Sequence, residues 1–128
     1  MNQKTAIKIM LWMLVVVILF HISIILKIVP YEITWGGRLK NDTQMYAFET
    51  ISILINLFLC IILLLKGKYI REFIPMKIIN ITLWIFFVLF GLNTVGNILA
   101  KTNFEKFFTL LTLTFCILIW IILHKGKK

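Results

Sequence analysis

The chain has 128 residues, of which 61% are hydrophobic and 15% are charged, and its formal net charge is +9. This length holds a single domain, residues 1–128, and so apolar a composition excludes an ordinary soluble core. The basic residues lie at the ends of apolar stretches and form no basic helix face, which argues against a nucleic-acid partner.

Four apolar stretches dominate the chain, at residues 6–29, 47–65, 78–100 and 107–123. Each has roughly the 20 residues that a helix needs to cross about 30 Å of hydrocarbon. Only helices and closed barrels satisfy every backbone N–H and C=O group in lipid, and runs such as 14–20 lack the polar alternation of barrel strands. The sequence therefore predicts an all-α fold, an integral membrane bundle of four antiparallel transmembrane helices with the lipid bilayer as its partner.

The first stretch, 6–29, begins like a secretory signal, since Lys4 and Lys8 precede an apolar run. It lacks a small-residue cleavage pattern and continues past His21, so we expect it to remain as an uncleaved anchor. His21 is the ionisable side chain that lies well within this span. Two interpretations of His21 stay open: it donates to a neighbouring carbonyl and joins two helices, or it belongs to a functional site.

The first connector, before residue 47, is the one with the most chemistry. A Gly-Gly pair beside a tryptophan permits a sharp turn with positive φ, and an arginine there balances two acidic residues. One interpretation is an outer cap that closes over Glu49. The alternative is a segment that re-enters the interface, anchored by its tryptophan. The candidate cap consists of Glu32, Trp35, Gly36, Gly37 and Arg38.

The second stretch, 47–65, carries a polar stripe at helical spacing. Its members are Glu49, Ser52, Asn56 and Cys60. A carboxylate in hydrocarbon costs several kcal/mol unless it is paired, hydrated or neutralised, so Glu49 is the strongest candidate for a functional residue. The alternative is an interfacial anchor, because Glu49 lies about one turn from the span's end and is within reach of water, Arg38 or Lys40.

Polar residues also recur in the third and fourth stretches. Asn93 and Asn97 lie one turn apart, and Thr109, Thr112 and Cys116 follow one stripe. Such residues are either interhelical hydrogen-bonding groups or ligands of a site. Gly96 and Ala100 form a small-xxx-small pair, which predicts close contact between two helices. The second connector mixes basic and apolar residues and either lies on anionic headgroups or only determines topology.

The basic residues are distributed unevenly over the two sides of the predicted bundle. Nine lie on the side of the termini: Lys4, Lys8, Lys66, Lys68, Arg71, Lys77, Lys125, Lys127 and Lys128. Five lie on the other side: Lys27, Arg38, Lys40, Lys101 and Lys106. The positive-inside rule therefore predicts cytoplasmic N- and C-termini in a bacterial inner (plasma) membrane.

Motifs of enzymes, metal sites and cofactor sites are missing from the sequence, since it has no HExxH, CxxC, GxGxxG or P-loop pattern. We therefore expect no cofactor and no metal. Cys60 and Cys116 are expected to be packing residues. A His21–Glu49 acid–base pair is the one catalytic option, and it makes a membrane-embedded enzyme the third functional hypothesis.

Several segments resemble a group of short four-span bacterial integral membrane proteins of unassigned function. They are YEITWGGR at 31–38, FET at 48–50, NTVGN at 93–97 and KTNFEK at 101–106. The resemblance spans most of the chain and implies that these segments belong together. It implies no activity.

The leading functional hypothesis is a small membrane protein that binds or conducts a small solute, ion or proton through an outward-facing polar site. The candidate site residues are Glu49, Asn93, Asn97, His21, Ser52, Asn56, Thr109 and Thr112. The alternative is a non-transporting accessory or assembly protein that uses its first extracytoplasmic loop. Four short helices bury limited area among themselves, which favours a homo-oligomer.

Overall fold

The computed structural model describes residues 2–30, 40–99 and 103–125, the last range without the side chains of 103–105 and 125. It contains four helices: α1 (Gln3–Ile25), α2 (Asp42–Lys66), α3 (Met76–Ile98) and α4 (Asn103–Lys125). The prediction of an all-helical fold is confirmed, and each helix is long and apolar enough to cross a membrane. The candidate outer cap, Glu32 to Arg38, lies outside the described residues.

The helices extend beyond the apolar stretches because polar residues cap their first turns. The side chain of Asn2 accepts a hydrogen bond from the Thr5 amide at 2.8 Å, and α1 begins at Gln3. The side chain of Asn41 accepts from the Gln44 amide at 2.9 Å, so α2 begins at Asp42 and not at residue 47. The starts predicted from the apolar stretches, at residues 6 and 47, were therefore a few residues too late.

Two helices end in the same left-handed turn, each with a lysine where glycine is usual. Lys27 has a φ of 62° and Lys68 a φ of 60°. In both turns the following amide reaches back to a carbonyl five residues earlier, Ile28 to Ser23 and Tyr69 to Leu64, each at 2.9 Å. This turn ends α1 at Ile25, before the predicted boundary at residue 29.

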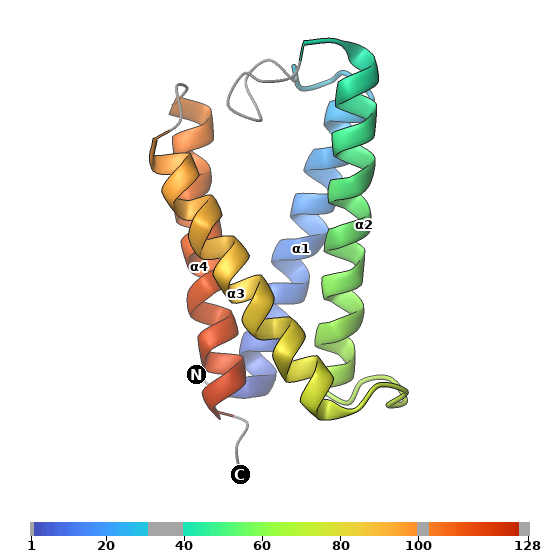
Figure 1. Cartoon of the computed structure of the whole chain (residues 1–128), viewed down its shortest axis with the longest axis vertical. Coiled ribbons are helices and arrows are strands. Elements are labelled where there is room, and N and C mark those ends of the chain that lie inside the picture. Colours follow the sequence, from blue (N-terminus) through green and yellow to red (C-terminus); the bar gives the residue numbers. More distant parts are fainter. Residues whose placement is uncertain (1, 31–39, 100–102, 126–128) are drawn as a thin grey trace.

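The helices associate as two side-by-side pairs, α1 with α2 and α3 with α4 (Figure 1). The start of α1 and the end of α4 lie at one end of the bundle, which we call the termini end. In this view the two pairs lie close together there and diverge toward the opposite end, which we call the far end. The Gln3 side chain donates to the Ile122 carbonyl at 2.9 Å and joins α1 to α4 at the termini end.

The apolar core fills the half of the bundle nearer the termini end. Its largest fully buried side chains include Ile7, Met10, Leu14, Leu59, Leu63, Leu83 and Phe115. The rings of Phe90 and Phe115 stack with centroids 4.9 Å apart and hold α3 against α4. Many other large apolar side chains lie on the outer surface, as expected where lipid replaces water.

The predicted close contact at Gly96 is not found between the described helices of this chain. A Cβ atom added to Gly96 meets no atom of the described residues within 4 Å, and Ala100 lies outside those residues. At Gly91 an added Cβ would be in ordinary van der Waals contact with α4, 3.9 Å from the Cys116 sulfur. Five residues turn a helix by about 500°, so Gly96 faces well away from the direction of Gly91.

Candidate functional site

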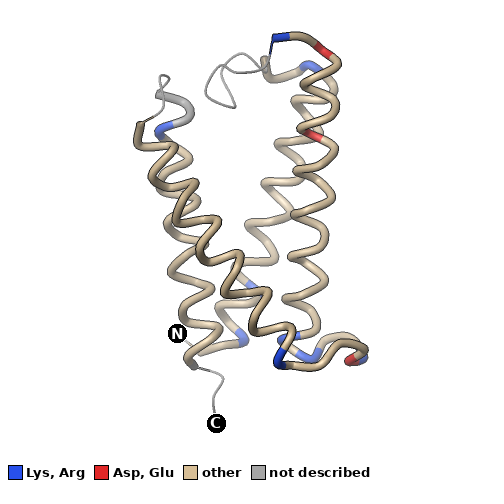
Figure 2. The backbone as a smooth tube through the Cα atoms, viewed as in Figure 1, with Lys and Arg blue, Asp and Glu red and all other residues tan. Residues whose placement is uncertain are grey.

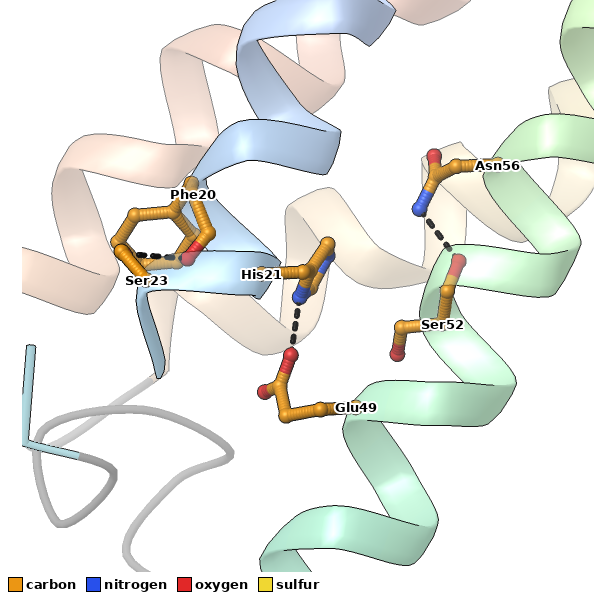
Figure 3. A network of polar contacts seen from close by, with 6 residues as sticks. All are labelled: Phe20, His21, Ser23, Glu49, Ser52 and Asn56. Atoms are coloured by element: carbon orange, nitrogen blue, oxygen red, sulfur yellow. Dashed lines mark hydrogen bonds and ion pairs between the residues drawn. The ribbon is translucent and has the colours of Figure 1, made fainter. Parts of the chain in front are cut away.

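The most buried charged group among the described residues is Glu49, whose residue is 0% exposed. Its carboxylate oxygen Oε2 is in hydrogen-bond contact with Nδ1 of His21, whose side chain is 16% exposed. Figure 3 shows the two side chains pointing toward each other from α1 and α2. The contact thus forms an ionisable pair across the α1–α2 interface.

The pair is covered by an apolar layer toward the far end. Ile24, at 1% exposure, and Met45, at 0%, form a small core cluster of their own. Both lie about one turn beyond the pair on their helices, since residues three and four apart share a helix face. Beyond them Lys27 and Asp42 form an ion pair at 2.5 Å, with each side chain about half exposed. Along the α1–α2 interface, from the far end inward, an exposed ion pair is therefore followed by an apolar layer and then by the buried ionisable pair.

The rest of the α2 stripe continues from Glu49 toward the termini end. Ser52 and Asn56 are both half-buried, and the Asn56 amide donates to the Ser52 carbonyl at 2.7 Å (Figure 3). Beside the pair, the Phe20 ring lies 5.9 Å from the His21 ring and 5.2 Å from the Phe108 ring, measured between centroids. Phe20 thus brings α4 up to the edge of the site.

A second polar group joins α3 to α4. The Thr94 hydroxyl donates to the Thr112 hydroxyl at 2.9 Å, and the Thr112 hydroxyl donates in turn to the Phe108 carbonyl of its own helix at 3.0 Å. Thr112 is 9% exposed. The hydroxyl oxygen of Thr109 is buried and has no hydrogen-bond partner in the described part of the chain. The Thr94–Thr112 contact is interhelical hydrogen bonding, one of the two interpretations left open by the sequence.

Asn93 and Asn97, the candidate site residues on α3, are not brought to the His21–Glu49 pair by any described contact. Asn93 is exposed, and Asn97 is half-buried. Neither side chain makes a hydrogen bond within the described residues. Lys40, which the sequence offered as a partner for Glu49, is exposed, and its backbone amide donates to the Gln44 side chain at 2.9 Å. The candidate residues therefore divide into an α1–α2 group and an α3–α4 group.

Sequence reasoning considered a His21–Glu49 pair only as an option and missed the Lys27–Asp42 pair. A usable signal was present in the spacing. Lys27 follows His21 by six residues and Asp42 precedes Glu49 by seven, which is about two helical turns in each case. Two helices joined as a hairpin bring such positions opposite each other in the same order.

Among the described side chains, the ionisable chemistry at this site is that of one imidazole and one carboxylate in contact. Among the side chains that the structure describes, no group of three or more His, Cys, Asp and Glu residues is placed to hold a metal ion. In the comparisons with known proteins, no family model, no curated protein and no solved structure matches the chain.

Proposed function

We propose that this chain is a multi-pass protein of the bacterial inner membrane that binds or conducts a small solute, ion or proton through an outward-facing polar site. Its four helices form an antiparallel bundle with both termini in the cytoplasm. Among the three kinds of cargo, the His21–Glu49 contact favours the proton. This contact is the observation that carries the proposal.

The His21–Glu49 pair occupies positions in a helix interface that apolar side chains could fill. Ionisable groups inside a membrane are expensive, and apolar side chains of similar size pack a helix interface without that cost. A buried pair kept at such a place indicates a use for its charge. Imidazole gains and loses a proton in the physiological pH range, and a carboxylate in contact with it is the natural partner for that proton. His21 is the more exposed residue of the pair, so a proton from outside reaches His21 first and Glu49 second.

The orientation of the proposal is tested by reporter fusions. Nine of the fourteen basic residues lie on the side of the termini. A reporter enzyme fused after Lys128 should therefore be found in the cytoplasm. A reporter enzyme inserted after Asn41 should be found on the extracytoplasmic side of the membrane. The opposite pair of results would place the His21–Glu49 site on the cytoplasmic side and contradict an outward-facing site.

The proton hypothesis is tested in liposomes that contain the purified protein and a trapped pH-sensitive dye. A potassium diffusion potential drives protons inward, and the wild-type protein should acidify the lumen faster than empty liposomes do. Glu49→Gln should reduce the rate to that of empty liposomes, because the amide keeps the size of the side chain but carries no exchangeable acid. Asp42→Asn is the matched control, since it removes an exposed carboxylate from the same helix and should keep the wild-type rate.

A protein that binds a proton without conducting it gives no flux, so a second measurement is needed. Infrared difference spectra between acidic and neutral pH should contain a carboxyl band that disappears in Glu49→Gln and persists in Asp42→Asn. If wild-type protein gives neither the flux nor this band, the proton hypothesis is wrong. The accessory-protein hypothesis then becomes the better one.

A further inference from the structure

A second buried charge lies at the opposite end of α2, away from the site described above. Lys66 is the last residue of α2, and it is only 8% exposed. Its ammonium nitrogen donates to the Oδ1 atom of Asn80 on α3 at 2.6 Å. Within the described residues this amide is its one hydrogen-bond acceptor, and no carboxylate pairs with it.

The helix end itself leaves the ammonium group under-satisfied. An ammonium has three N–H donors, and Asn80 accepts from only one of them. The carbonyls of Leu63, Leu64 and Leu65 already accept from the amides of the turn that follows α2. A buried charge is stable when it is both paired and hydrogen-bonded, so Lys66 lacks an anion.

The surroundings of Lys66 are basic. Lys68 and Arg71 in the connector and Lys77, one turn before Asn80 on α3, are all exposed. The start of α1 adds two exposed lysines, Lys4 and Lys8. It lies against the beginning of this connector, because a Cβ added to Gly67 would be 3.4 Å from the Ile7 side chain. In the described part of the termini end, Glu72 is the one acidic residue (Figure 2). The region therefore attracts anions.

The same connector also presents apolar side chains. Phe73 is 69% exposed and Tyr69 is 43% exposed, between the basic residues. Such a mixture suits the headgroup layer of a membrane, where aromatic rings enter the interface and basic residues meet phosphates. A soluble anion would explain the charges but not the exposed aromatic rings beside them.

We propose that the α2–α3 end of the bundle binds the headgroup of an anionic phospholipid, with its phosphate on the Lys66 ammonium. Asn80 positions that ammonium, and Lys68 and Lys77 contribute further positive charge. In the orientation that the basic residues favour, this end meets the cytoplasmic leaflet, whose surface is negatively charged. The binding is independent of His21 and Glu49.

The test measures thermal unfolding of the full chain in a neutral detergent. Added phosphatidylglycerol should raise Tm by about 5 °C, as expected for a ligand that binds only the folded state at saturating concentration. Phosphatidylcholine and inorganic phosphate should not. Lys66→Met should lose most of this rise, while Lys106→Met, which removes an exposed lysine at the far end, should keep it.

Asn80→Asp gives the sharpest result because it does not depend on a loss of stability. The new carboxylate pairs with Lys66 inside the protein, so Tm should rise without lipid and the response to phosphatidylglycerol should shrink. The proposal is overturned if phosphatidylcholine or inorganic phosphate reproduces the rise. It is also overturned if Asn80→Asp responds to phosphatidylglycerol as fully as the wild-type chain does.

Discussion

Replacing His21 with leucine is expected to lower the free energy of unfolding by about 3–5 kcal/mol, because it removes the imidazole that contacts the buried carboxylate of Glu49. The double replacement His21→Leu/Glu49→Leu should recover most of that loss, since two apolar side chains then pack where two ionisable groups met. The measurement is reversible unfolding in mixed micelles of a mild detergent and sodium dodecyl sulfate. We expect the effect of the double replacement on the free energy of unfolding to differ strongly from the sum of the two single effects, and this difference is the coupling energy of the pair.

The matched control is the other ion pair on the same α1–α2 interface. Lys27→Leu breaks the contact with Asp42, whose side chains are about half exposed, and should cost no more than about 1 kcal/mol. If His21→Leu lowered the free energy of unfolding by as little as Lys27→Leu does, the burial of the Glu49 carboxylate would not depend on its contact with His21. The double leucine variant has a further use, since a stable bundle without the pair should also lack proton activity in liposomes.

Replacing Gly91 with leucine is expected to destabilise the chain by about 1–3 kcal/mol, the usual cost of inserting a side chain into a packed interface. Gly91 faces α4, and the Cys116 sulfur lies 3.9 Å from the position of a Cβ. A leucine needs far more room than that, so α3 and α4 must separate or shift. The loss is measured as a lower midpoint of unfolding in the same mixed micelles.

Gly96→Leu makes the same chemical change on the same helix and should leave that midpoint almost unchanged. Among the described residues nothing lies within 4 Å of a Cβ at Gly96, and an apolar side chain facing lipid costs little. If Gly96→Leu were the more damaging of the two variants, a contact at Gly96 would exist that this arrangement of α3 does not contain, such as one with a second copy of the chain.

The sequence by itself determined the helical class, the number of helices long enough to cross a membrane and the two ionisable residues, His21 and Glu49, that lie within apolar stretches. Long apolar runs allow only a helix that satisfies its own backbone in lipid, and this constraint acts within each segment without regard to its neighbours. Glu49 and His21 were singled out for the same reason, since a charge in an apolar run is costly wherever the helix packs. The helix starts were missed by a few residues because Asn2 and Asn41 begin α1 and α2 through local capping bonds.

The tertiary structure alone decided which polar residues meet. Which side of a long apolar helix faces a neighbour is weakly encoded, because lipid and protein interior accept the same side chains. The sequence therefore placed Asn93 in the site and Gly96 in an interface, whereas both are exposed. The pairing of His21 with Glu49 depends on the register between α1 and α2, which the packed layer of Ile24 and Met45 holds. Register comes from side-chain packing between helices, so it could not be deduced from either helix alone.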